Sequence, residues 1–185
     1  MLINHPKLVL DACCLINLHV SGRLGELIRA LPVRVAVSEI VWEQEVPTLR
    51  RALDEGLGGQ GGAYDTQRGV AEGLIDVLQF QSDEADAFVE YAAELRDDGE
   101  SATCAIAFAR RWAIATDDRA AIRLIERRAP ETQVVTTPEL VKHWVESTDP
   151  SPEAVRRVIE RIQEIGRYQP PRSHPLWAWW DGAQR

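Results

Sequence analysis

The strongest constraint on the fold is a regular alternation of short apolar runs with longer amphipathic segments. Short runs rich in branched apolar residues are typical of buried strands, and apolar residues at helical spacing follow most of them. Neighbouring parallel strands need crossover segments of this length, so the order predicts a mostly parallel sheet with helices on both faces. The expected strands are 7–10, 33–37, 74–80, 112–116 and 133–135, and the expected helices are 12–20, 24–31, 38–46, 82–98, 100–111, 118–128, 138–145 and 150–165.

The chain divides into one α/β domain and a C-terminal extension. We expect the domain over residues 1–148, with a mobile glycine-rich surface loop over about 54–69. Residues 149–185 are expected to form a helix and a tail that contains Trp177-Ala178-Trp179-Trp180. Large aromatic side chains favour packing on the domain or on a second copy in a homodimer, with stacking on nucleic-acid bases as the alternative.

Composition and cysteine usage indicate a globular protein without an export signal. The chain is 45% hydrophobic and 27% charged, and no apolar run approaches the roughly 18 residues of a membrane span. Its first residues lack the basic and apolar pattern of a signal peptide, so we expect a cytoplasmic protein with no membrane contact. Three cysteines without a Cys-x-x-Cys pair argue against a disulfide framework or a zinc ribbon, and we interpret them as structural.

The acidic side chains follow the expected strands in a suggestive pattern. Asp11 comes directly after the first strand, and Asp117 and Asp118 follow the strand at 112–116. Right-handed crossovers bring the carboxyl ends of parallel strands to one edge of the sheet, where such folds keep their sites. Glu100 opens a segment that is apolar on every side. Each acid alone fits a helix cap or a first-turn position, but several at one edge favour a common site.

An oxygen-only cluster of this kind suits a hard cation. Carboxylates are the ligands preferred by Mg²⁺ and Mn²⁺, and no His or Cys pair has zinc spacing. The net charge of −8 argues mildly against nucleic-acid binding. A bound cation would offset part of this charge, and the arginines are clustered.

Three segments resemble motifs of the PIN-domain family. The run Leu8–Leu18 resembles the opening of these proteins, and Gly99–Ala102 and Ala115–Asp118 resemble their later acidic motifs in the same order. The resemblance covers about residues 7–146. It implies an α/β/α sandwich and a Mg²⁺- or Mn²⁺-dependent ribonuclease like the toxins of bacterial toxin–antitoxin pairs. It also implies metal ligation by Asp11, Glu100 and Asp117, with Asp118 as a fourth carboxylate and Asn17 and Thr116 as polar supports.

The sequence departs from the family pattern in the helix after the second strand. The family usually carries a glutamate there, and the aligned residue is Gln44, between Glu43 and Glu45. Adjacent residues on a helix lie about 100° apart, so at most one of the three can face the site. We favour Glu43 as the additional metal ligand, with Glu45 as the alternative.

Basic residues near the acids are the candidates for contact with RNA. Arg119 and Arg123 lie one turn apart on the helix that follows Asp118, and Arg110 and Arg111 precede the same strand. A solvated helix face is the competing interpretation. We therefore expect Arg119 and Arg123 to contact RNA beside the metal.

The residues leave three functional hypotheses. The first is a metal-dependent ribonuclease, with RNA as substrate and an antitoxin protein as partner if it is a toxin. The second is a catalytically weak PIN-like domain that binds RNA or protein without cutting. The third, a haloacid-dehalogenase-type phosphatase, is disfavoured because such enzymes usually carry an Asp two residues after the first, where this chain has Cys13.

Overall fold

The computed structural model describes residues 3–44 and 66–184. Its centre is a five-stranded sheet, parallel throughout, in the order β3-β2-β1-β4-β5. The strands are β1 (Lys7–Leu10), β2 (Arg34–Ser38), β3 (Ile75–Leu78), β4 (Ala113–Ala115) and β5 (Val134–Val135). The expected α/β class with a central parallel sheet is confirmed.

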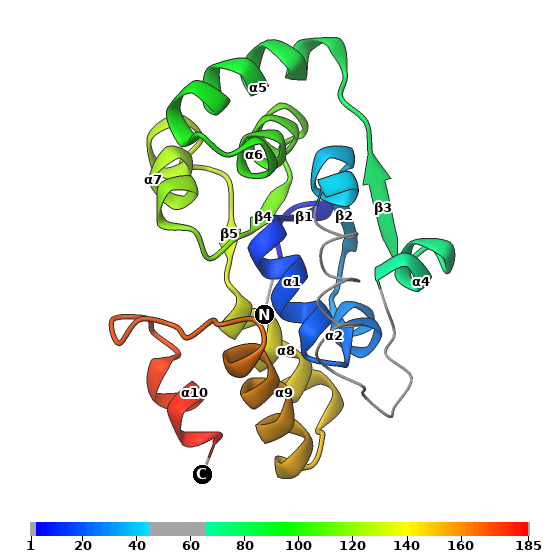
Figure 1. Cartoon of the computed structure of the whole chain (residues 1–185), viewed down its shortest axis with the longest axis vertical. Helices are drawn as coiled ribbons and strands as arrows, with labels where there is room; N and C mark the ends of the chain where they lie inside the picture. The colour runs from blue at the N-terminus through cyan, green and yellow to red at the C-terminus, as the bar shows by residue number, and fades with distance from the viewer. Residues whose placement is uncertain (1–2, 45–65, 185) are drawn as a thin grey trace.

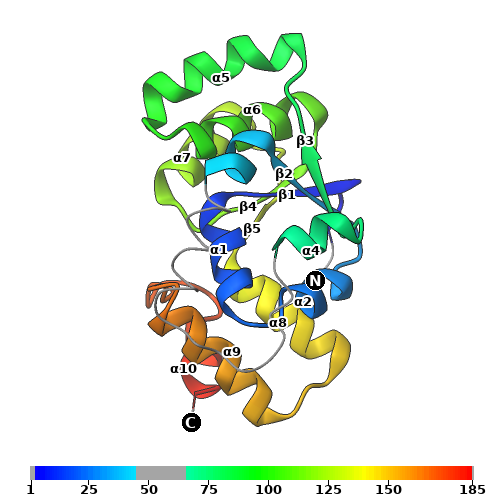
Figure 2. The same cartoon turned by 45° about the vertical axis from the view of Figure 1, so that its right-hand side comes forward.

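Helices cover both faces of this sheet and give a three-layer α/β/α sandwich (Figures 1 and 2). On one face Leu8 and Leu10 share a core with α1, α2, α8 and α9; on the other Val9 packs with α6 and α7. The alternation follows from the strand, in which successive side chains point to opposite faces. The helices are α1 (Ala12–Val20), α2 (Leu24–Ala30), α4 (Thr66–Ala71), α5 (Ser82–Leu95), α6 (Asp98–Arg110), α7 (Arg119–Arg128), α8 (Thr137–Thr148), α9 (Pro152–Glu164) and α10 (Trp177–Gly182).

Helix α6 lies between the sheet and α5 (Figure 1). This position explains why its sequence is apolar all round: every residue from Ser101 to Ala107 is buried. Gly99 is also buried, and a Cβ there would lie 3.3 Å from Val41 Cγ2. The N-terminus of α6 is thereby held against the helical residues 39–44.

Several element ends differ from the predictions. Helix α5 begins at Ser82 as expected but ends at Leu95 rather than at 98, and its N-cap, Gln81, forms a capping box with Glu84. Helix α6 begins at Asp98, so Gly99 lies inside it, and Asp97 is its N-cap. Part of the expected loop over 54–69 is helical, because α4 starts at Thr66; residues 54–65 lie outside the described part of the chain.

The C-terminal extension packs on the same core as the rest of the chain. Helix α9 contributes Val155, Val158, Ile159 and Ile162, and the tail adds Trp180, which is only 1% exposed. No described helix combines the length and the apolar character that a membrane span requires.

Candidate metal centre

The turns after β1 and β4 lie side by side because these strands pair in parallel. The ladder extends one residue further, where the Asp11 amide donates to the Ala115 carbonyl at 2.9 Å. Asp11 and the segment Thr116-Asp117-Asp118 therefore reach the same edge of the sheet.

Asp11 is a buried carboxylate that only neutral groups contact. Its side chain is 1% exposed and accepts hydrogen bonds from the Ala12 amide at 2.8 Å, the Thr116 hydroxyl at 2.9 Å and the Cys13 thiol at 3.4 Å. Burial raises the pKa of Asp11 from 3.8 to about 6, although these hydrogen bonds oppose the rise.

Glu100 faces Asp11 from the first turn of α6. Burial raises the pKa of Glu100 from 4.5 to about 8, with further upward contributions from the charges of Asp11, Asp118 and Asp97. Within the described residues, neither Lys nor Arg forms an ion pair with Asp11, Asp97, Glu100 or Asp118. Four carboxylates thus share one region without a counter-charge, and a bound cation would supply it.

Asp118 and Thr116 tie the acidic cluster to the backbone. One oxygen of Asp118 caps α7 by accepting from the amides of Ala120 at 2.5 Å and Ala121 at 2.9 Å. The Thr116 hydroxyl donates to Asp11 and accepts from the Asp118 amide at 3.1 Å. Thr116 is fully buried and fixes the two acids relative to each other, which is the supporting position expected for it.

Asp117 points the other way and does not join this cluster. One of its oxygens accepts from the Thr137 amide at 3.0 Å and the Tyr168 hydroxyl at 2.8 Å. The other accepts from the Thr137 hydroxyl at 2.5 Å, the Asn17 amide at 3.3 Å and the Cys14 thiol at 3.5 Å. The geometry therefore does not support Asp117 as a ligand beside Asp11. It gives this residue, and Asn17 with it, a role in joining α1, α8 and the tail.

Glu43 is not among the carboxylates that act on Glu100. Its side chain is exposed, and it follows Val41, the residue that contacts Gly99, by two positions. Two positions correspond to about 200° around a helix, so Glu43 lies on the side away from α6. The preferred ligand among the three candidates is thus not supported, and the alternative, Glu45, lies outside the described residues.

A second group of potential ligands lies beside the first. One atom each of Cys13, Cys14 and Asp117 lies within 4.8 Å of the others. Cys14 is fully buried, and burial raises the pKa of its thiol well above the usual value, which disfavours the thiolate that binds metal.

The acidic cluster needs side-chain adjustment before it can close on one ion. Among the described residues, its carboxylate oxygens do not form a group within 4.8 Å of one another. Glu100 has the rotatable bonds to adjust, and Mg²⁺ commonly keeps several waters between itself and its carboxylates. The oxygen-only donor set and its uncompensated charge fit such an ion.

The arginines near the cluster fall into two groups. Arg110 is committed to the fold: it donates to the buried Glu84 at 2.6 and 2.9 Å and to the Gln79 carbonyl. Arg119 and Arg123 are exposed, and neither has a partner in the described part of the chain. The two arginines expected to contact RNA are therefore the ones that remain available.

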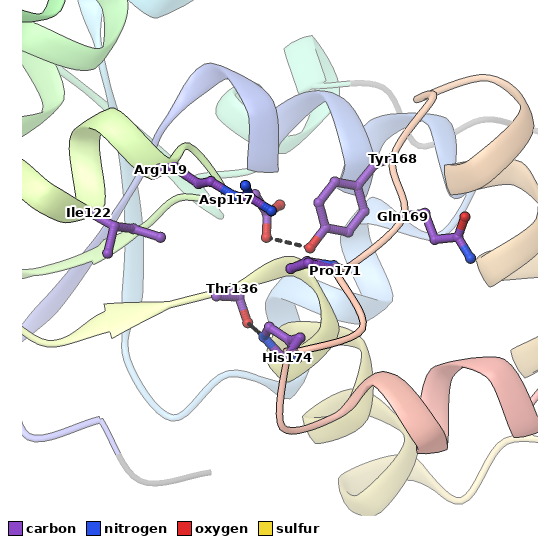
Figure 3. A pocket seen from close by; sticks show the side chains of 8 residues that line it. All are labelled: Asp117, Arg119, Ile122, Thr136, Tyr168, Gln169, Pro171 and His174. Carbon is purple, nitrogen blue, oxygen red and sulfur yellow. Dashed lines mark hydrogen bonds between the residues drawn. The ribbon is translucent and has the colours of Figure 1, made fainter.

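A pocket of about 300 Å³ opens next to Asp117, between α7 and the C-terminal tail (Figure 3). Arg119 and Ile122 lie on its α7 side, and Tyr168 on the tail side. Its lining residues are Asp117, Arg119, Ile122, Thr136, Tyr168, Gln169, Pro171 and His174. That the tail would line a pocket could not be predicted from the sequence, because its prolines and aromatic residues fit simple packing equally well. The sequence also did not indicate Asp97 as a member of the acidic cluster.

Comparison with known proteins assigns neither a family nor a function to this chain. No protein-family model matches the chain, and no curated protein matches its sequence.

Proposed function

We propose that this protein is a Mg²⁺- or Mn²⁺-dependent ribonuclease of the PIN type that hydrolyses RNA phosphodiester bonds. The observation that carries the proposal is the convergence of Asp11, Glu100, Asp118 and Asp97 at the carboxyl edge of a parallel sheet without a basic partner. Grouping buried carboxylates in this way lowers the stability of the fold unless they bind a cation or a proton. The ordered resemblance of three segments to PIN motifs directs the choice to RNA cleavage.

Within this proposal each residue has a distinct task. Asp11, Glu100 and Asp118 would hold the cation, and a bound cation would supply the activation of water and the neutralisation of charge on the phosphate. Thr116 fixes Asp11 relative to the Asp118 turn. Arg119 and Arg123 bind the phosphates of the strand on either side of the scissile bond.

Calorimetric titration of Mn²⁺, followed by an assay on a mixed single-stranded RNA, tests the proposal. The wild type should bind Mn²⁺ and cleave, and Asp11→Asn should lose both. Asp86→Asn removes an exposed carboxylate of α5 and serves as the control, with both properties retained. Cleavage that survives in Asp11→Asn would exclude this site as the catalytic centre.

A toxin role and a silent binding role remain as narrower and alternative proposals. The closed set of bonds around Asp117 and the outward position of Glu43 favour a catalytically weak domain that binds RNA or protein. Metal binding without cleavage of any RNA would support that alternative. Growth arrest on induced cytoplasmic expression, relieved by Asp11→Asn and by a protein encoded beside this one, would support a toxin with its antitoxin.

A further inference from the structure

The residues that line the pocket between α7 and the tail suit the binding of a planar ring. The rings of Tyr168, Pro171 and His174 and the side chain of Ile122 give it a largely apolar wall (Figure 3). Its volume of about 300 Å³ lies at the lower end of the range for ligand sites. A single nucleotide unit is of a suitable size, and larger ligands are not.

Four polar side chains of the wall, those of Asp117, Thr136, Tyr168 and His174, already have hydrogen-bond partners. The Leu176 amide donates to His174 Nδ1 at 3.1 Å, so His174 Nε2 carries the proton and donates to the Thr136 hydroxyl at 3.0 Å. That hydroxyl in turn donates to Glu139 at 2.7 Å. Tyr168 is held by its bond to Asp117 and by an edge-to-face contact with Trp180. These bonds hold the side chains of the wall in place. A ligand ring would therefore bind there mainly by stacking on the wall rather than by hydrogen bonds to these side chains.

The charges of Asp117 and Arg119 determine the orientation in which a nucleotide would bind. The Asp117 carboxylate in the wall repels phosphate, although five donors from this protein shield it. Arg119 is exposed and lacks a partner among the described residues. A base can occupy the apolar interior while Arg119 contacts its phosphate outside.

The pocket and the proposed metal centre share the turn that follows β4. Asp117 lines it, the next residue, Asp118, belongs to the acidic cluster, and Arg119 follows directly. A strand whose phosphate lies at the cluster would bring a neighbouring nucleotide to this pocket.

We propose that the pocket is a nucleotide subsite, which holds one base of a single-stranded RNA next to the phosphate at the acidic cluster. The subsite rests on the proposed ribonuclease function for its substrate class, but it binds RNA without the metal. Because stacking is tolerant of base identity, the subsite sets the position of the strand rather than a strict sequence.

Binding without metal tests the subsite separately from catalysis. Fluorescence anisotropy of a labelled single-stranded RNA in EDTA would compare the wild type with two pocket variants, Arg119→Ala and Ile122→Trp. Ile122→Trp fills the pocket and should weaken binding roughly tenfold, the size expected for the loss of one stacked base. Arg119→Ala should weaken binding and reduce the salt dependence by about one phosphate contact. Arg157→Ala, an exposed arginine of α9 that does not line the pocket, is the control.

Each outcome decides a different question. Weaker binding by both pocket variants supports the subsite, whether or not Mn²⁺ then permits cleavage. If the wild type cleaves RNA and the pocket variants keep their affinity and KM, the subsite is excluded and the ribonuclease stands. If Ile122→Trp fails to fold by circular dichroism, Ile122→Phe takes its place as the pocket-filling variant, because Arg119 also contacts phosphate in the proposed function. Equal affinity for free AMP and for the strand would replace the strand subsite with a mononucleotide site, and no RNA binding with or without Mn²⁺ would overturn both proposals.

Discussion

Asp11→Asn should stabilise the metal-free protein at neutral and alkaline pH, because it removes a buried charge. A rise in the pKa of Asp11 from 3.8 to about 6 corresponds to about 3 kcal/mol, at 1.36 kcal/mol per pKa unit. The folded protein binds the Asp11 proton more tightly than the unfolded chain does. Stability is therefore lost as pH rises from about 4 to about 6, and the full cost is present above that range.

Replacement of Asp11 by asparagine restores only part of the stability that the buried charge removes. It remains a good N-cap for α1, so the bond from the Ala12 amide is retained. Its amide group, however, replaces one of the oxygens that accept from Thr116 and Cys13, and a lost buried hydrogen bond costs about 1 kcal/mol. The net stabilisation above pH 7 is then about 1–2 kcal/mol.

Urea denaturation in EDTA at pH 8 and at pH 4 measures this difference. The variant should be more stable than the wild type at pH 8, and its advantage should disappear at pH 4, where Asp11 is protonated in the folded protein. Saturating Mn²⁺ should reverse the order at pH 8, since it stabilises only the form that binds it. A variant that is less stable than the wild type at pH 8, or a difference independent of pH, would refute the reasoning.

Three further predictions follow from single contacts. Gly166→Ala should reduce the free energy of unfolding by about 1–3 kcal/mol in urea denaturation, because its Cβ would lie 2.6 Å from Asn17 Oδ1; an unchanged midpoint would mean that this packing is loose. Arg110→Ala should cost about 3–5 kcal/mol, since it leaves the buried Glu84 without its partner, and an effect below 1 kcal/mol would contradict the contact. Glu100→Gln should abolish Mn²⁺ binding in calorimetry but leave the metal-free protein at least as stable at pH 7, because the raised pKa of Glu100 marks its charge as unfavourable there.

Much of the candidate site could be predicted because it follows from strand order. Asp11 directly follows β1 and Asp118 lies in the turn that follows β4, and a parallel sheet brings such positions together whatever the surrounding side chains are. The position of Thr116 could be predicted too, since it directly follows β4 and precedes Asp117 and Asp118. That Asp97 belongs to the acidic cluster could not be predicted, because its position depends on the path of the connection between α5 and α6.

The difference between Asp117 and Asp118 could not be predicted from their adjacent places in the sequence. Asp118 caps α7 and its charge acts on Glu100, whereas Asp117 accepts hydrogen bonds from Thr137 and Tyr168, which lie 20 and 51 residues further along the chain. The backbone of one turn decides which carboxylate faces the cluster. The same is true of Glu43, whose direction depends on how its helix docks on Gly99.

The sequence alone determined the alternation of strands and helices, the parallel sheet and the edge at which the acids gather, because these follow from periodicity and chain direction. Tertiary structure alone decided which acids lack partners, which arginines remain available and how the tail forms a pocket with α7. The physical reason is that periodicity is a local property, whereas burial, pairing and cavities depend on contacts between residues far apart in the chain.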